Sequence, residues 1–272
     1  MSNLITRTIT GIIFIAVIVC SLLWSPIPFS ILFLIFALTA LYEFYSMVLG
    51  KTNMHLFISG MLAGAVLYIS IALYSLKIIP AEWLYFNFIL LNLIFLMELL
   101  DDGSSAVRNT SYAVLGVIYV VLPFALLNLF YSLEEDAVDF NAHFLLGYFI
   151  LTWSYDTLAF ICGKIFGRTK LFPEVSPQKT WEGAIAGGVF TLAAAYLIFH
   201  FYGELELAHW IVIAFLVIIL GTFGDLIESM FKRNFNVKDI GKALPGHGGV
   251  LDRFDGLLFS APAVLFYFYM IR

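Results

Sequence analysis

The chain has 272 residues, of which 62% are hydrophobic and only 12% are charged, and its mean hydropathy is +0.97. Soluble domains contain about half apolar and a quarter charged residues, so this composition excludes an ordinary soluble domain. The net charge of −5 says little about partners, because the two signs are segregated along the chain. We predict an all-α polytopic integral membrane protein and expect no nucleic-acid partner.

Nine apolar runs have about the length that a membrane-crossing helix needs, which is about 20 residues. They cover approximately residues 5–24, 29–48, 55–76, 83–100, 111–131, 144–164, 184–202, 209–231 and 257–271. Pro26 and Pro28 separate the first two runs, and Asp101 and Asp102 end the fourth. No small-x-small cleavage site follows the first run, so we expect this helix to be retained. The chain therefore has about nine predicted transmembrane helices.

The distribution of basic residues predicts how these helices are oriented. Lys and Arg are retained on the cytoplasmic side of membranes. If the N-terminus is cytoplasmic, 12 of the 14 basic residues lie on cytoplasmic segments, and only Lys77 and Arg272 do not. The pattern favours a cytoplasmic N-terminus, an outside C-terminus and polar loops that face the cytoplasm.

Polar groups divide the chain into two predicted parts. Residues 1–142 form about five helices with few polar groups, whereas residues 143–272 hold nearly all candidate catalytic residues and their cytoplasmic loops. Cys20 and Cys162 both lie in apolar runs, where a cysteine usually serves as a small buried hydrophobe. We expect no disulfide framework.

The end of the eighth run carries four polar residues at helical spacing. Asp225, Glu228, Ser229 and Lys232 follow the i, i+3, i+4, i+7 pattern, so they share one face of a helix. An unpaired charge at this depth costs several kcal/mol. Asp225 is therefore either neutralised by a basic neighbour or a ligand for a metal or substrate.

A glycine-rich turn and two carboxylates precede the last run. Asp252 and Asp255 are three residues apart and can share a divalent cation, because Mg²⁺ prefers carboxylate oxygens. Arg253 between them can hold a phosphate or balance their charge. Backbone N–H groups in the turn 245–249 can approach phosphate oxygens. His247 in this turn is either a phosphate contact or a surface histidine.

Further polar groups lie upstream. Asp156 sits midway along the sixth run, where an ionisable residue is a functional hypothesis by default. The segment 176–183 offers hydroxyls, an ammonium and a carboxylate just before a helix, which suits anion binding. Glu43 and Glu98 lie near the predicted cytoplasmic ends of their runs, where helix packing explains them as well as function does. The loop after Asp156 is basic and either binds anions or only sets topology: Lys164, Arg168, Lys170 and Lys179.

The spacing of these residues resembles that of one enzyme family. The pattern reads Ser229-x-x-Lys232-Arg233, Lys238-Asp239, and His247-Gly248-Gly249-x-x-Asp252-Arg253-x-Asp255. Upstream segments also match, at Asp156-Thr157, at Ser176-Pro177-x-Lys179-Thr180-x-Glu182-Gly183 and at Gly224-Asp225-Leu226-x-Glu228-Ser229. The resemblance is to the phosphatidate cytidylyltransferase, or CDP-diacylglycerol synthase, family of integral membrane enzymes, and it is strong over residues 150–256.

The resemblance implies a magnesium-dependent reaction of CTP with phosphatidic acid in the bilayer, which gives CDP-diacylglycerol and pyrophosphate. It implies metal ligands at Asp225, Asp252 and Asp255, with Asp156 as a further ligand and room for a second cation. The other catalytic residues would be Lys232, Arg233, His247 and Arg253. Substrate-binding residues would be Ser176, Lys179, Thr180, Glu228, Ser229, Lys238, Asp239, Gly248 and Gly249.

The expected location is a bacterial cell (inner) membrane with the active site facing the cytoplasm, an organellar membrane stays an alternative, and the assembly can be a homodimer. Two other enzyme functions remain open, a CTP-dependent lipid kinase and a CDP-lipid synthase for another lipid phosphate. A cation transporter would need repeats or broken helices and polar groups serving both membrane faces. Here the polar residues crowd one predicted face, which disfavours transport.

Overall fold

A computed structural model of the chain describes residues 2–50, 53–99, 105–131, 138–203, 205–237, 240, 241, 243 and 248–271, with only the backbone for 2–7 and 138–141. The chain forms two compact units. Unit 1 comprises Met1–Asp136 and Asp239–Arg253, and unit 2 comprises Ala137–Lys238 and Phe254–Arg272. A segment near the C-terminal end of the sequence therefore belongs to the N-terminal unit.

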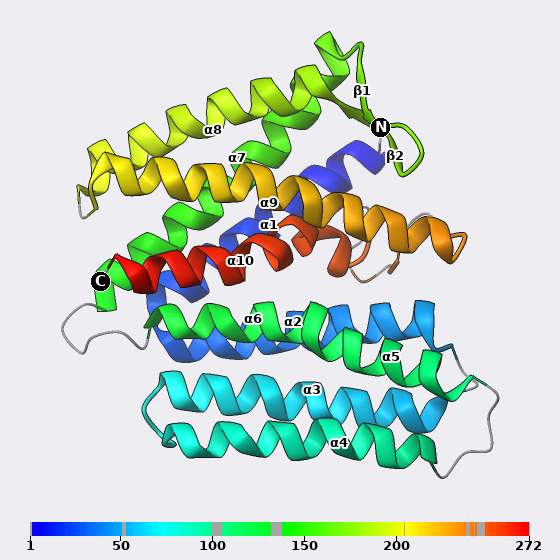
Figure 1. Cartoon of the computed structure of the whole chain (residues 1–272). Helices are drawn as coiled ribbons and strands as arrows, with labels where there is room; N and C mark the ends of the chain where they lie inside the picture. The colour runs from blue at the N-terminus through cyan, green and yellow to red at the C-terminus, as the bar shows by residue number, and fades with distance from the viewer. Residues whose placement is uncertain are drawn as a thin grey trace. The chain divides into compact units, whose positions relative to one another are not determined.

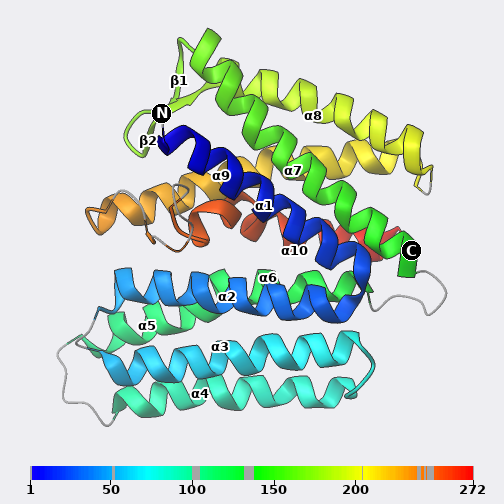
Figure 2. The same cartoon turned by 180° about the vertical axis from the view of Figure 1, so that it is seen from behind.

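Unit 1 is built from apolar helices in which α3 and α4 lie side by side (Figures 1 and 2). Pro26 and Pro28 lie in the first turn of α2, where a missing N–H costs nothing, and the Ser25 hydroxyl accepts a hydrogen bond from the Ile27 N–H. The long helices are α1 (Ser2–Trp24), α2 (Pro26–Val48), α3 (Met54–Ser75) and α4 (Phe86–Leu99). A 3-10 turn (Ala81–Tyr85) precedes α4. The last helical stretch joins α5 (Ala106–Gly116), a π-helical turn (Val117–Val121), α6 (Leu122–Leu126) and a 3-10 turn (Leu127–Tyr131).

An aromatic core holds unit 1 together. The rings of Phe29 and Phe33 stack with centroids 4.2 Å apart, an arrangement that adds to the gain from burial. Tyr45 is fully buried on α2 and donates its hydroxyl hydrogen to the Ala113 carbonyl. Gly60 on α3 and Gly116 on α5 leave the space that this ring fills. Large aromatic residues and facing glycines thus fix how the helices of this unit pack.

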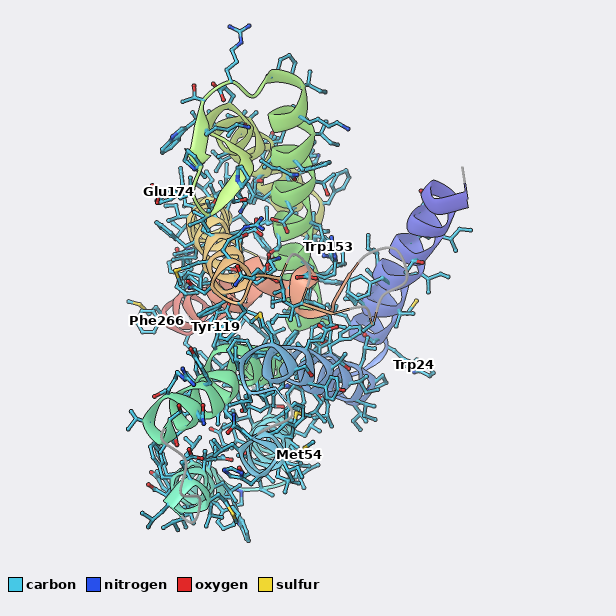
Figure 3. The ribbon with its side chains drawn as sticks, turned by 90° about the vertical axis from the view of Figure 1, so that its right-hand side faces the viewer. Trp24, Met54, Tyr119, Trp153, Glu174 and Phe266 are labelled. Atoms are coloured by element: carbon cyan, nitrogen blue, oxygen red, sulfur yellow. The ribbon has the colours of Figure 1, made fainter. Side chains whose placement is uncertain are left out.

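Unit 2 contains α7 (Val138–Phe166), α8 (Trp181–Tyr202), α9 (Leu207–Asn234) and most of α10 (Leu251–Met270). Between α7 and α8 the chain forms a two-stranded antiparallel hairpin of β1 (Lys170–Phe172) and β2 (Ser176–Thr180). Glu174 lies in the turn of this hairpin, and Trp153 marks the middle of α7 in Figure 3. The sequence predicted a loop here, so the hairpin is the one exception to the all-α expectation among the described residues.

Small residues allow the helices of unit 2 to approach closely. A Cβ atom at Gly187 of α8 would lie 2.7 Å from the Cβ of Ala159 on α7, and one at Gly183 would lie 2.8 Å from the Gly163 Cα. Between α9 and α10, a Cβ at Gly256 would lie 3.4 Å from the Gly221 Cα. Such close backbone approach is common between helices in membranes, where packing must replace the hydrophobic effect.

In the described part of the chain, each of the nine predicted apolar runs coincides with a helical stretch, apart from the end residues 76 and 271. Seven helical stretches in the described part of the chain are long and apolar enough to cross a membrane: Pro26–Val48, Met54–Ser75, Ala81–Leu99, Ala106–Tyr131, Ala142–Phe166, Trp181–Tyr202 and Leu207–Asn234. The apolar stretch Thr8–Trp24 is shorter. Helix α10 begins at Leu251, before the predicted apolar run that starts at 257, and its first turn contains the charged residues Asp252 and Arg253. The chain is an integral membrane protein, and the number of nine crossings stays a prediction.

Adjacent glycines on α8 provide a test of this packing. We expect Gly187→Ala to lower the free energy of unfolding by about 1–3 kcal/mol, because the new Cβ would overlap Ala159. The control is Gly188→Ala, whose Cβ would lie at an ordinary 3.6 Å from Ile218 and would favour the helix by about 1 kcal/mol. Thermal unfolding in one detergent compares them, and equal stabilities would contradict the packing described here.

Candidate functional site

Three carboxylates gather in unit 2. Asp225 and Glu228 come from α9 and Asp255 comes from α10, and one oxygen of each lies within 4.8 Å of the others. Glu228 and Asp255 are buried, and Asp225 is half-buried. We call these three residues the carboxylate cluster. A buried group of acidic oxygens is stable only if positive charge or hydrogen-bond donors compensate it.

Helix spacing and close packing create the cluster. Asp225 and Glu228 are three residues apart on α9, so their side chains lie on one face. Gly224 lies directly against the backbone carbonyl of Asp255, with no room for a side chain, and Phe259 Cβ is 2.9 Å from the position of a Cβ there. The Asp255 Oδ1 atom accepts a hydrogen bond of 2.8 Å from the Gly256 N–H. The absence of a side chain at Gly224 thus lets α10 bring Asp255 to α9.

Two lysines compensate part of the negative charge. The Lys179 ammonium, on β2, forms an ion pair and hydrogen bond with Asp225. The Lys232 Nζ atom lies 2.7 Å from Glu228 Oε2, at i+4 on the same helix. Each of these two carboxylates therefore has a basic partner, which the sequence left open for Asp225. Asp255 has no such lysine contact among the described residues, and the hard oxygen atoms of the three carboxylates suit a divalent cation.

A pocket of about 670 Å³ opens beside the cluster. Its size falls in the range of ordinary small-ligand sites. The polar lining residues come from α7, the hairpin and α9, and they include three lysines: Tyr155, Asp156, Lys164, Lys170, Ser176, Gln178, Lys179, Thr180, Thr222 and Asp225. Apolar residues, among them Ala159, Phe160 and Leu171, complete the wall. Asp225 belongs both to the pocket and to the carboxylate cluster, so a ligand in the pocket would reach the cluster directly.

The hairpin that carries Ser176 and Lys179 is fixed by the start of α8. The Glu182 carboxylate accepts hydrogen bonds from the backbone N–H groups of Arg168 (3.1 Å) and Thr169 (3.0 Å). The Thr180 hydroxyl caps α8 by accepting a hydrogen bond of 3.3 Å from the Gly183 N–H. Thr180 is buried and, in this structure, holds the hairpin in place beside the pocket.

In unit 1, a second group of contacts surrounds the glycine-rich turn. The Asp252 Oδ2 atom accepts a hydrogen bond of 3.0 Å from the Gly249 N–H, and Gly248 has a φ of +87°, which favours glycine. The Leu251 N–H donates to Glu43 Oε2 of α2 over 3.0 Å. One backbone N–H group of the turn that the sequence suggested for phosphate, at Gly249, thus donates to a carboxylate.

The structure places the remaining predicted residues as follows. Ser229 is half-buried on α9, and the Arg233 Nε atom donates to the Val175 carbonyl at 3.4 Å. Arg253 is exposed in the first turn of α10. Asp156, a predicted metal ligand, lines the pocket. The carboxylate cluster contains Glu228 instead, which the sequence predicted only as a substrate contact. Three predicted site residues lie outside the described residues: Lys238, Asp239 and His247.

Two neutral residues of the site had no signal in the sequence analysis. Tyr155 on α7 and Thr222 on α9 share a hydrogen bond between their hydroxyl groups and line the pocket. Their spacing in the sequence is ordinary for membrane helices, so only the packing of α7 against α9 reveals them. Glu43 had a signal, an acidic residue in an apolar run, but its partner lies more than 200 residues away.

The Lys232–Glu228 pair can be tested by a double substitution. We expect Lys232→Met to lower the free energy of unfolding by on the order of 3 kcal/mol, because buried Glu228 loses its partner charge. Adding Glu228→Gln should recover most of that loss, since no buried charge remains at this position. Thermal unfolding in detergent measures both variants. A double variant no more stable than Lys232→Met would contradict the pairing.

Comparison with known proteins identifies the family. The model of the cytidylyltransferase family matches residues 5–271. A phosphatidate cytidylyltransferase of Rickettsia prowazekii (strain Madrid E) is 38% identical over 201 residues, which cover 71% of this chain and 86% of the relative. One of Staphylococcus aureus (strain COL) is 33% identical over 263 residues, 94% of this chain and 95% of the relative. Together with the charged pattern and the carboxylate cluster, these matches show that the chain belongs to the cytidylyltransferase family.

Proposed function

We propose that this protein transfers CMP from CTP to phosphatidate and thereby makes CDP-diacylglycerol and pyrophosphate for phospholipid synthesis. The observation that carries the proposal is Asp225, which joins a polar pocket of ligand size to a cluster of three carboxylates. Family membership and relatives named phosphatidate cytidylyltransferase support the choice of substrates. A site in an integral membrane protein suits a lipid substrate.

The proposed reaction needs no strong general base. Phosphatidate already carries an ionised phosphate, and one of its oxygens attacks the α-phosphorus of CTP. The new P–O bond forms as the bond from the α-phosphorus to the bridging oxygen of the β-phosphate breaks, and pyrophosphate takes the electron pair. The obstacle is the repulsion between two polyanions, so the protein contributes chiefly positioning and positive charge.

Basic residues around the site supply that positive charge. Lys179 lines the pocket and contacts Asp225, so its ammonium is placed where a ligand phosphate would lie. Ser176 and Gln178 on the same strand line the same pocket and offer neutral donors. In our proposal the remaining cations bind the phosphates of CTP, phosphatidate or pyrophosphate: Lys232, Arg233, Lys238 and Arg253. His247 is assigned a phosphate contact in the same way.

The carboxylate cluster fits Mg²⁺ by its chemistry. Asp225, Glu228 and Asp255 offer acidic oxygens within 4.8 Å of one another, and lysines pair with two of these three carboxylates. We propose that Asp225 and Asp255 hold the ion with Glu228 beside them. When bound, Mg²⁺ neutralises and orients phosphate oxygens. Asp252 and Asp156 stay predicted ligands, and a second cation stays part of the proposal.

Our proposal also includes the topology. Nine crossings with a cytoplasmic N-terminus and an outside C-terminus place 12 of 14 basic residues on the cytoplasmic side. CTP is a cytoplasmic metabolite, so the site would face the cytoplasm. The bacterial relatives support a bacterial inner membrane as the location.

The reaction can be tested directly with purified protein. We expect protein supplied with CTP, phosphatidate and Mg²⁺ in mixed micelles to release pyrophosphate and CDP-diacylglycerol in equal amounts. Thin-layer chromatography of the lipid and enzymatic detection of pyrophosphate follow both products. Chelation with EDTA should stop turnover, and added Mg²⁺ should restore it. Release of CDP together with a phosphorylated lipid would contradict the proposal and would indicate a lipid kinase.

A charge-neutral substitution tests the metal role of the cluster. We expect Asp255→Asn to lower Mn²⁺ affinity at least tenfold, because one anionic ligand is lost, and to abolish turnover while the protein stays folded. Electron paramagnetic resonance of free Mn²⁺ measures binding without turnover. The control is Glu82→Gln, an exposed acidic residue of unit 1. Near-normal Mn²⁺ affinity in the Asp255 variant would contradict the assignment.

A further inference from the structure

Glu43 is a buried acidic residue whose contacts lie far from it in the sequence. It sits on α2 with only 5% of its surface exposed. Its Oε2 atom accepts a hydrogen bond of 3.0 Å from the N–H of Leu251, the first residue of α10. The first N–H groups of a helix have no partner within the helix and carry partial positive charge. The Glu43 carboxylate therefore satisfies the start of α10.

Described residues of the loop before α10 lie close to the same carboxylate. A Cβ at Gly249 would lie 2.6 Å from Glu43 Oε2, and Gly241 lies even closer, against Oε1. Neither position has room for a side chain while Glu43 is in place. The backbone N–H groups of Ala243 and Val250 also face the carboxylate. The Glu43 side chain thus accounts for the absence of a side chain at these two positions of the loop.

The Glu43 carboxylate and the loop before α10 depend on each other because of the carboxylate's charge. A buried carboxylate is costly unless hydrogen-bond donors surround it, and here the donors are backbone N–H groups of the loop. The Oε1 atom has no hydrogen-bond partner within the described part of the chain. If the loop moved away, Glu43 would lose these donors, and if Glu43 were lost, the N–H groups of the loop would lose this acceptor on α2. Each therefore stabilises the other.

A second carboxylate holds the loop from its other side. Asp252 accepts from the Gly249 N–H over 3.0 Å, and its Oδ2 atom lies 2.9 Å from the position of a Cβ at Gly248. Asp252 belongs to α10 itself, so it shapes the turn locally. Glu43 instead ties the turn to a different helix. The hydrogen bond from Leu251 to Glu43 thus ties the first residue of α10 to α2.

We propose that Glu43 is a positioning residue for catalysis, which holds the glycine-rich loop and the first turn of α10 in the geometry that CMP transfer needs. The inference rests on the proposed function, because α10 carries Asp252, Arg253 and Asp255. Glu43 itself touches backbone groups rather than reacting atoms. Its removal should therefore slow the reaction by misplacing other residues.

The isosteric variant Glu43→Gln tests this role. It keeps the side-chain volume but removes the negative charge, so the hydrogen bonds that the N–H groups of the loop donate to this side chain become weaker. We expect backbone amide exchange at Leu251 to accelerate at least tenfold. We also expect kcat to fall about 10- to 100-fold, as for other small misplacements of reacting groups, while KM for CTP changes less than about threefold. Hydrogen–deuterium exchange and steady-state kinetics measure these effects.

Glu98→Gln is the matched control. Glu98 is equally buried in unit 1, at 4% exposure, but its Oε2 atom pairs with His55 Nε2 at 2.9 Å rather than with the loop. Loop exchange and kcat should match the unsubstituted protein in this variant. Equal losses in the two variants would mean that any buried carboxylate of unit 1 has this effect, and would overturn the proposal.

A second variant disturbs the contact between Glu43 and the loop by a change in the loop itself. Gly249→Ala places a Cβ against the Glu43 carboxylate and should reproduce both effects even if Glu43→Gln does not fold. Unchanged Leu251 exchange in the folded variants, or faster exchange with kcat within twofold of normal, would overturn the proposal. If the unsubstituted protein transfers no CMP, the proposed function fails separately, and the exchange experiment still decides whether Glu43 holds the loop.

Discussion

The cost of placing charge in an apolar helix bundle governs the site. Asp225 and Glu228 can lie on a membrane-type helix because Lys179 and Lys232 pair with them, and both lysines come from segments of unit 2. Asp255 joins them as a third carboxylate, and a divalent cation would offset the repulsion between the three groups. The same electrostatic requirement thus accounts for the folded structure and for the proposed use of Mg²⁺.

Close helix packing is what turns separate acidic residues into a site. Gly224 lies against the Asp255 backbone, and Gly183 and Gly187 bring α8 against α7. The first contact assembles the carboxylate cluster, and the second forms part of the framework that holds the hairpin and the pocket. A glycine in a helix weakens it by about 1 kcal/mol, so these positions trade local stability for proximity. Glu182 and Thr180 then fix the hairpin that carries Lys179.

Carboxylates have two different roles in this protein. In the cluster they face one another, lysines and a pocket, which suits ion and phosphate chemistry. Around the glycine-rich turn, Glu43 and Asp252 accept hydrogen bonds from backbone N–H groups. Sequence spacing treated Asp252 and Asp255 alike because both lie at the start of one helix. Their partners differ. The Oδ2 atom of Asp252 accepts a hydrogen bond from the Gly249 N–H of the turn, whereas Asp255 lies beside Asp225 and Glu228 of α9.

The sequence by itself determined the membrane class, the positions of the nine helical runs and the family, because hydropathy and the spacing of charged residues are local properties of the chain. It also predicted site roles for Asp225, Asp255 and Lys179, which lie close together in the structure, and these roles stay predictions. Tertiary structure decided which charges pair, the hairpin, the inclusion of Glu228, and the link from Glu43 to Leu251, 208 residues away. These depend on which helix faces meet and how closely, and such contacts between distant segments leave no periodic signal in the sequence.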